Sequence, residues 1–191
     1  MDPDLELLAE ISGAVEVRPS PGKGKGTFAK EFVPKGTRLI SERPILRMSS
    51  NYFNDETLKK MVQNLPTTER RDFEDLHCPI CQPEQALRQK YIMNHFSLSV
   101  PQIGICLQGS RINHSCLPNA YSSWNDKKDR FMIHAIADIQ EGDEVTISYC
   151  DALATKDMRS KWLEVYQFSC ECAACRTTDQ ISNSGKRFTK E

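Results

Sequence analysis

The sequence predicts a mainly β domain, with some α, that is interrupted by a helical insert. Three observations carry this prediction. Strand-like segments broken by turn residues run from Ala14 to Met48, a helical pattern runs from Asn51 to about Arg88, and strand-like segments return from Ile92 to Tyr149. A chain of 191 residues, 39% of them hydrophobic and 27% charged, is long enough to bury one domain core with the insert as a subdomain.

The first β half is expected to be a series of short strands. The segments "AVEVRPS", "GTFAKEF" and "TRLISERPIL" are separated by the turn sequences "PGKGKG" and "VPKG". The second half ends with "RFMIHAIADI", the turn "QEGD" and the strand-like "EVTISY", in which Asp143 follows Gly142.

The insert contains two helical patterns. In "NDETLKKMVQNL" the apolar residues share one face: Leu58, Met61, Val62 and Leu65. In "PTTERRDFEDL", Pro66 and Thr67 are helix-start signals, and Phe73 and Leu76 form the apolar side. A further helix is expected in "TKDMRSKWLEVY", where three apolar residues fit one face: Met158, Trp162 and Val165.

These patterns divide the chain into six parts. The expected parts are an N-terminal extension (1–13), the first β half (14–50), the helical insert (51–90), the second β half (91–150), a helix with a cysteine-rich segment (151–175) and a polar tail (176–191). The tail is expected to be frayed.

Composition limits the classes of function. Net charge is −1 and the Lys and Arg residues are scattered, so no direct nucleic-acid partner is expected. The acidic start "MDPDLELLAEISGAV" lacks the features of a signal peptide, and no apolar run approaches a membrane span. An intracellular, reducing compartment follows, in which eight cysteines are better interpreted as metal ligands and free thiols than as disulfides.

The stretch "FSCECAAC" predicts a zinc site, because it places Cys170, Cys172 and Cys175 within six residues. A structural zinc ion needs four ligands, so one is missing from this stretch. Five other cysteines could supply it: Cys78, Cys81, Cys106, Cys116 and Cys150.

Four of these five have simpler interpretations. Cys78 and Cys81 in "HCPIC" form a lone CxxC pair with no second pair, which is a weak signal. Cys106 in "IGICLQG" and Cys150 at the end of a strand are expected to be small buried side chains. Cys116 lies in "RINHSCLPNAY", which is too polar for a core strand; a tight turn remains the alternative there.

Five motifs occur in the order found in one enzyme family. "GKGKGTFA", "NHFSL", "RINHSCLPNA", "EGDEVTISY" and "FSCECAAC" resemble SET-domain protein lysine methyltransferases with a post-SET zinc motif, most closely the SMYD-like branch and related fungal SET proteins. The resemblance covers roughly Val15 to Cys175. It implies a SET β-fold of small sheets with a C-terminal pseudoknot. It also implies one structural Zn²⁺ held by four cysteines: Cys116, Cys170, Cys172 and Cys175.

The resemblance implies an S-adenosyl-L-methionine-dependent protein-lysine N-methyltransferase that releases S-adenosyl-L-homocysteine and acts on a histone or another protein. The loop at Lys23, Gly24 and Lys25 would meet the amino-acid end of the cofactor, and Asn94 would hold its methionine portion. Ser110 is assigned to the same site. The remaining cofactor contacts would come from Asn113, His114, Tyr149, Tyr166 and Phe168, the last two covering the adenine.

Tyr149 is the expected catalytic residue, with its hydroxyl beside the transferring methyl and the lysine nitrogen. The expected substrate channel comprises Phe96, Tyr121 and Ser122, with Ser122 near the position that influences how many methyl groups are added. A narrow apolar channel favours loss of the lysine proton, since desolvation disfavours the charged amine. Positioning can then supply much of the rate, and no enzyme nucleophile is required.

The chain departs from the SMYD-like branch in two places. The insert has only His77, Cys78 and Cys81 and cannot form a MYND finger, and only 16 residues follow Cys175, so that branch's large C-terminal helical domain is not expected. Two alternatives stay open: a non-catalytic SET-fold scaffold, and an unrelated zinc-stabilised interaction domain. The expected enzyme is a monomer, with no membrane partner, in the nucleus or cytoplasm.

Overall fold

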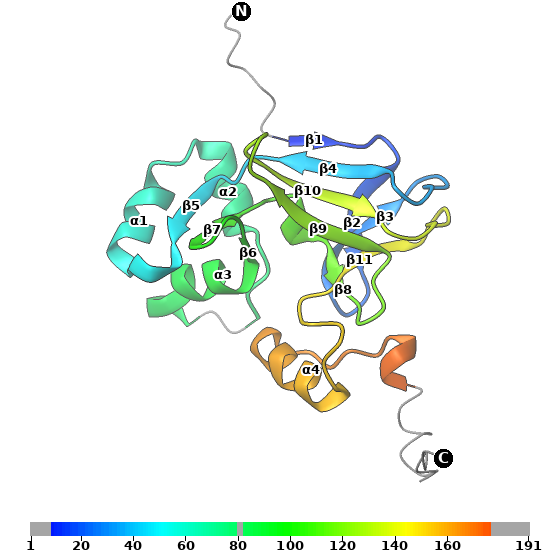
Figure 1. The fold of residues 1–191 in the computed structure, drawn as a ribbon. Helices are drawn as coiled ribbons and strands as arrows, with labels where there is room; N and C mark the ends of the chain where they lie inside the picture. The colour runs from blue at the N-terminus through cyan, green and yellow to red at the C-terminus, as the bar shows by residue number, and fades with distance from the viewer. Residues whose placement is uncertain (1–8, 80–81, 177–191) are drawn as a thin grey trace, which may run out of the picture.

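The computed structural model describes residues 9–79 and 82–176 and contains three small β-sheets, a helical insert and a separate C-terminal helix (Figure 1). Cys81 and the tail from residue 177 onward lie outside these residues. Within them, no helix is long and apolar enough to span a bilayer.

The first sheet has the strand order β1-β4-β10-β9, and all of its pairings are antiparallel. Its strands are β1 (Ala9–Ile11), β4 (Arg38–Glu42), β10 (Arg130–Ala135) and β9 (Ala120–Asn125). Ile133 lies opposite Ile40, and both are buried in the main hydrophobic core. One face of this sheet therefore closes the core of the β domain.

The second sheet joins the two halves of the β domain in the order β2-β3-β11-β8. Its strands are β2 (Val15–Ser20), β3 (Gly24–Ala29), β11 (Glu144–Ile147) and β8 (Asn113–His114). The β11–β8 pairing is parallel, with Thr146 opposite Asn113 and Ile147 opposite His114. This register places the "NHSC" motif beside the strand that leads into Tyr149.

The third sheet and the helical insert share a second hydrophobic cluster. The sheet has the order β5-β7-β6, with β5 (Leu46–Ser49), β7 (Gln102–Ile105) and β6 (His95–Ser97). The insert contains η1 (Ser50–Tyr52), α1 (Asp55–Gln63), α2 (Thr67–Glu74), η2 (Pro83–Gln85) and α3 (Ala86–Asn94). Leu58, Val62, Phe73 and Leu76 are buried, as the helical patterns predict.

The insert extends further than the sequence pattern suggests. Strand-like structure was expected from Ile92, but α3 continues to Asn94 and the strand begins at His95. The expectation was wrong because tertiary contacts fix the helix end. Tyr91 is fully buried and donates from its hydroxyl to the Ile103 carbonyl at 3.1 Å, and the Asn94 side-chain amide donates to the His77 carbonyl at 2.9 Å.

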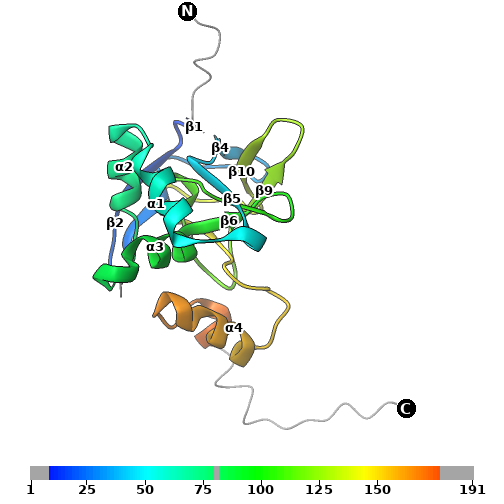
Figure 2. The same cartoon turned by 90° about the vertical axis from the view of Figure 1, so that its left-hand side faces the viewer.

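The C-terminal helix α4 (Lys156–Leu163) and the turn η4 (Glu164–Tyr166) lie apart from the sheets in both views (Figures 1 and 2). Thr155 caps α4 by accepting a hydrogen bond from the Met158 amide. Within these two elements only Leu163 is buried, and Trp162 and Val165 are 43% and 50% exposed. Packing against the core therefore contributes little to holding this segment.

Candidate active site and cysteine cluster

Four cysteines from distant parts of the chain converge after η4. The Sγ atoms of Cys116, Cys170, Cys172 and Cys175 all lie within 4.8 Å of one another, and those of Cys116 and Cys175 are 3.5 Å apart. Four thiolates around a tetrahedral zinc ion, at about 2.3 Å each, lie about 3.8 Å from one another. The donor set therefore fits one closed, four-thiolate metal site, with the fourth cysteine that the resemblance implied.

His114 links this cluster to Tyr149. Its Nδ1 accepts a hydrogen bond from the Tyr149 amide at 3.0 Å, so the neutral ring carries its proton on Nε2, 3.3 Å from the Cys116 sulfur. Burial, followed by the positive charges of Arg159 and Lys23, lowers the pKa of His114 to about 4. The neutral imidazole thus orients a cysteine of the cluster and the backbone of the candidate catalytic tyrosine.

Arg159 of α4 also contacts the cysteine cluster. Its guanidinium interacts with the Cys116 and Cys175 thiol groups, which raise its pKa. A four-thiolate zinc centre carries two net negative charges, and a neighbouring guanidinium would offset part of them. The sequence reasoning did not single out Arg159, because nothing in the "TKDMRSKWLEVY" pattern separates it from other exposed helical cations.

A second possible donor group shares Cys116. His114, Cys116 and Cys150 also offer atoms within 4.8 Å of one another. The ring nitrogens of His114 are already engaged by the Tyr149 amide and the Cys116 sulfur. The four-cysteine group therefore has the more complete donor set.

Glu144 gathers three donors at the loop expected to meet the cofactor. Its carboxylate accepts from Ser20 Oγ at 2.9 Å, Lys23 Nζ at 2.8 Å and Asn113 Nδ2 at 2.7 Å. Burial works to raise the pKa of Glu144, but the hydrogen bonds from Lys23, Asn113 and Ser20 outweigh it and leave the pKa below its usual value. A Cβ at Gly26 would lie 2.5 Å from this carboxylate and 2.9 Å from Asn113 Nδ2, so a larger residue would have to displace these hydrogen-bonded groups.

Lys25 joins the same loop to the helical insert. Its ammonium lies 2.5 Å from Asp75 Oδ2, which also pairs with Arg111 Nη2 at 2.7 Å. The hydrogen bond from Lys25 and the charge of Arg111 lower the pKa of Asp75 despite partial burial. Gly24 has a φ of +76°, a backbone conformation that favours glycine, and a Cβ at this position would lie 3.7 Å from His77 Nδ1.

Asn94 and Ser110 are connected to each other and to His77 by hydrogen bonds. Asn94 is 8% exposed and its amide donates to the His77 carbonyl at 2.9 Å. Ser110 Oγ lies 3.1 Å from the Asn94 carbonyl and 2.8 Å from the Cys106 carbonyl. Both side chains are thus tied to protein groups that connect the insert with the turn η3 (Gly109–Arg111).

Glu42 anchors η3 from the first sheet. Its carboxylate is 2% exposed and accepts from the Gly109 amide at 2.7 Å and the Gln108 amide at 3.1 Å. Burial raises the pKa of Glu42 to about 7, although the two amide hydrogen bonds oppose the shift. Since Ser110 and Asn113 follow directly, Glu42 fixes the turn that presents them.

Aromatic rings surround Tyr149. Its ring centroid lies 4.9 Å from that of Tyr166 and 5.3 Å from that of His114, and Phe168 lies 5.9 Å from His114. The Tyr149 hydroxyl donates to the Ile112 carbonyl at 2.6 Å. Loss of solvent raises the pKa of Tyr149, so the phenol stays protonated.

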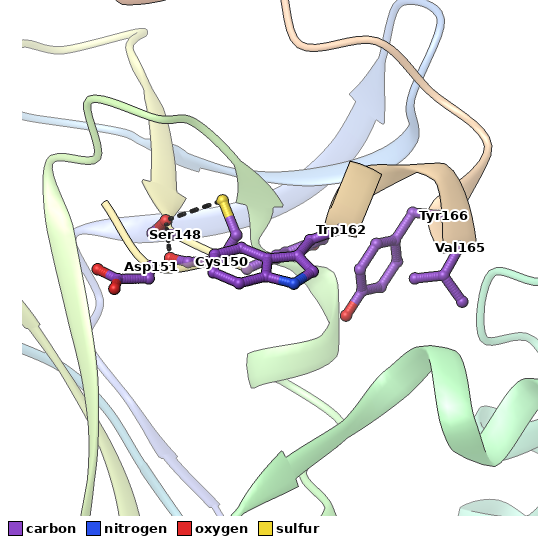
Figure 3. Close-up of a pocket in the computed structure, with 7 residues that line it drawn as sticks. Ser148, Cys150, Asp151, Trp162, Val165 and Tyr166 are labelled. Carbon is purple, nitrogen blue, oxygen red and sulfur yellow. Dashed lines mark hydrogen bonds between the residues drawn. The ribbon is translucent and has the colours of Figure 1, made fainter. Parts of the chain in front are cut away.

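A hollow of about 510 Å³ opens beside Tyr149. Ser148, Cys150 and Asp151 lie on one side of it, and Trp162, Val165 and Tyr166 of α4 and η4 lie on the other (Figure 3). Its volume is in the range of small-molecule sites. The C-terminal segment therefore provides one wall of the hollow, and the segment directly after β11 provides the other.

The expected channel residues are more dispersed. Phe96 packs against Phe131 with ring centroids 4.3 Å apart and is partly buried against the main core. Tyr121 is 63% exposed on β9, and the half-buried Ser122 is the next residue of that strand. Successive strand residues point to opposite faces, so only one of these two can face a given side of the sheet.

Glu144 and Arg111 lie in or beside the sequence motifs, but their roles were not predicted from them. An acidic residue inside "EGDEVTISY" and a cation directly before "INHSC" were the available signals. Asp75 and Glu42 had no such signal, because their roles depend on contacts across 36 or more positions in sequence.

The SET domain family matches residues 24–150. The chain belongs to the SET-domain family. Histone-lysine N-methyltransferase set5 of Schizosaccharomyces pombe is 30% identical over 169 residues, which cover 86% of this chain and 51% of that protein. Histone-lysine N-methyltransferase SMYD3 of Homo sapiens is 36% identical over 97 residues, covering 48% and 22%. This SET-domain chain thus spans about half the length of the first relative.

A solved structure of a Plasmodium falciparum protein, described as a candidate histone methyltransferase, is 19% identical with a TM-score of 0.46 and covers 74% of this chain and 96% of its own. The family match confirms the resemblance stated above and the predicted SET β-fold.

Proposed function

We propose that this SET-domain chain is an S-adenosyl-L-methionine-dependent protein-lysine N-methyltransferase. The family match and the activities in the names of the set5 and SMYD3 relatives support this function. The observation that carries it is the arrangement around Tyr149: a protonated phenol, neighbouring aromatic rings and a hollow of about 510 Å³ meet where the "NHSC" and "VTISY" motifs pair.

The orientation of Asn113 fits the amino-acid end of the cofactor. Its Nδ2 donates to the Lys25 carbonyl at 3.1 Å and to Glu144 at 2.7 Å, so both amide hydrogens have protein acceptors. The Oδ1 atom is therefore the acceptor of this side chain, which suits a cationic ammonium donor. Lys23 and Lys25, from the adjacent loop, are the candidate partners of the cofactor carboxylate, which would share them with their present partners Glu144 and Asp75.

The aromatic residues suit the other end of the cofactor. Tyr166 and Phe168, with ring centroids 6.4 Å apart, offer faces on which an adenine can stack. When bound, S-adenosyl-L-methionine supplies an electrophilic methyl group. Tyr149 would orient the substrate amine, and desolvation of the lysine in a narrow channel would favour loss of its proton.

The cysteine cluster would hold a structural Zn²⁺. Four thiolate ligands leave no open coordination position, so the metal would hold the post-SET segment against β8 without entering the reaction. Cys116, Cys170, Cys172 and Cys175 are the proposed ligands.

The proposed substrate is a lysine-containing protein or peptide, histone or not, and the proposed location is the nucleus or the cytoplasm. The proposal includes a monomer as the active form, with Phe96, Ser122 or Tyr121 lining the lysine channel.

Calorimetric titration of the zinc-loaded protein with S-adenosyl-L-methionine tests this function. We expect saturable binding that Asn113→Ala removes, whereas Asn64→Ala, at the exposed end of α1, leaves it unchanged. Absence of binding by folded, zinc-loaded protein would refute the enzyme and favour the non-catalytic SET-fold module.

A further inference from the structure

A second hollow, which we call the basic hollow, lies at the opposite end of the molecule from α4. It is about 540 Å³ in volume and is formed by β1, β4 and the turn between β9 and β10, at the top of Figures 1 and 2. Five cationic side chains line it: Arg38, Arg43, Lys127, Lys128 and Arg130. It shares no residue with the hollow beside Tyr149.

The two acidic residues in the lining already have partners. Glu10 pairs with Arg38 at 2.9 Å, and Asp129 pairs with Arg47 at 2.8 Å. Among the residues that the structure describes, neither Lys127 nor Lys128 has an ion-pair partner. The basic hollow therefore has a surplus of positive charge that its own acids do not offset.

The turn that carries these lysines is held in place. The Lys128 amide donates to the Asn125 carbonyl and side chain at 3.2 and 3.0 Å, and Asp129 adopts a φ of +52°. Trp124 donates to Asp126 at 2.9 Å, and the Arg47 guanidinium lies 4.7 Å from the Trp124 ring. The two ammonium groups are thus presented by a fixed turn, which limits the entropy lost on binding.

Arg130 provides a rigid donor group beside them. It is 6% exposed, and its Nη1 donates to the Ser41 carbonyl of β4 at 3.2 Å. Its fixed positive charge lies beside the two ammonium groups of the adjacent turn, which can donate to several oxygens of one anion. Concave walls of one charge sign also concentrate counter-ions.

We propose that the basic hollow binds phosphate groups. A phosphate presents three acceptor oxygens and up to two negative charges, which matches several converging donors better than a single carboxylate does. The phosphate could belong to a small phosphorylated ligand or to a nucleic-acid backbone. This site goes beyond the proposed methyltransferase function, and it does not depend on it.

The test uses two phosphate probes on the full chain. Calorimetry measures inorganic pyrophosphate, and fluorescence anisotropy measures a short labelled DNA duplex at about 50 and about 200 mM salt. The test variant is Lys127→Ser with Lys128→Ser. The matched control is Lys59→Ser with Lys60→Ser, another adjacent exposed lysine pair, on α1.

We expect pyrophosphate to bind and the Lys127/Lys128 variant to weaken it by about tenfold, with the control unchanged. Melting temperature and S-adenosyl-L-methionine affinity should be equal in both variants, which separates this result from a folding defect. If the duplex also binds, pyrophosphate competes, and the salt slope falls by about 2 in the test variant, the phosphate comes from nucleic acid. Pyrophosphate binding without duplex binding identifies a small phosphorylated ligand.

Three results would overturn the proposal. The first is that neither probe binds in low salt. The second is that both double variants lose the same affinity, which would indicate general surface charge. The third is that an oligoglutamate peptide competes as well as pyrophosphate, which would make this a carboxylate site.

Discussion

The proposed cofactor site has two walls that are held in different ways. The loop wall, comprising Lys23–Lys25, Asn113 and Glu144, is tied to the sheets by hydrogen bonds of 2.7–3.1 Å and by the parallel β11–β8 register. The post-SET wall, comprising Trp162, Val165, Tyr166 and Phe168, has exposed apolar side chains and approaches the domain through ring contacts and the cysteine cluster.

The difference indicates which wall depends on a metal. The loop wall is part of the β core and should persist whenever the sheets fold. The post-SET wall buries only Leu163 within α4 and η4, which is too little apolar surface to hold a segment of that size. Four thiolates on one ion would supply the missing attachment.

The largest effect is expected from a substitution that removes a proposed metal ligand. Cys172→Ser should abolish the bound zinc, because three thiolates and a hydroxyl bind it far more weakly than the about 10–16 kcal/mol typical of structural sites. Cys150→Ser is the matched control and should keep one zinc per chain. Elemental analysis of purified protein measures both. Loss of zinc from Cys150→Ser would instead favour the alternative donor group with His114.

The second largest effect is expected from a substitution of Tyr149, the residue at which the two walls meet. Tyr149→Phe should lower kcat for methyl transfer by about 10²–10³-fold, as expected when a polar group that positions the reacting amine is lost. The Kd for S-adenosyl-L-methionine should change little, since the aromatic ring remains. Tyr52→Phe, which alters an 80% exposed ring, is the control. Full activity of Tyr149→Phe would remove this tyrosine from the mechanism.

The pH dependence of stability tests the role of Glu42, which anchors the turn before Asn113 of the loop wall. Its pKa is about 7 in the folded protein and lies near 4.5 when the chain is unfolded. The folded state therefore binds more protons between these values, and stability present below pH 4.5 is lost as pH rises through 7, by up to about 3 kcal/mol. Denaturant unfolding should show this fall, and Glu42→Gln should flatten it. Identical pH profiles would contradict the assignment.

The smallest effect is expected from a substitution that weakens contacts to the amino-acid end of the cofactor and leaves contacts to its adenine end unchanged. Glu144→Gln should weaken S-adenosyl-L-methionine about tenfold, as for one lost charge-assisted contact, because it disturbs Asn113 and Lys23. Binding of 5′-methylthioadenosine, which lacks the amino-acid end, should be unchanged. Glu141→Gln, exposed in the same turn region, is the control. Equal losses for both ligands would indicate a general structural role.

Local patterns predicted the helices of the insert because their buried faces, such as Leu58 and Val62, repeat at helical spacing. They misplaced the end of α3, where Tyr91 is fixed by a hydrogen bond to another segment. The fourth cysteine came from the family resemblance, since spacing alone could not join Cys116 to residues more than 50 positions away. Likewise, scattered lysines and arginines gave no sign of the basic hollow, because the fold assembles it from β1, β4 and the β9–β10 turn.

We propose that a metal ion holds the post-SET wall in place and that cofactor binding depends on this wall. The loop wall stays folded when the metal is absent. The most direct test is calorimetric titration of S-adenosyl-L-methionine into zinc-loaded and chelator-treated protein, with far-UV circular dichroism of both. We predict that chelation abolishes binding while the β-sheet signal is retained. Metal-free protein that keeps its sheets and binds the cofactor with the same affinity would contradict the account.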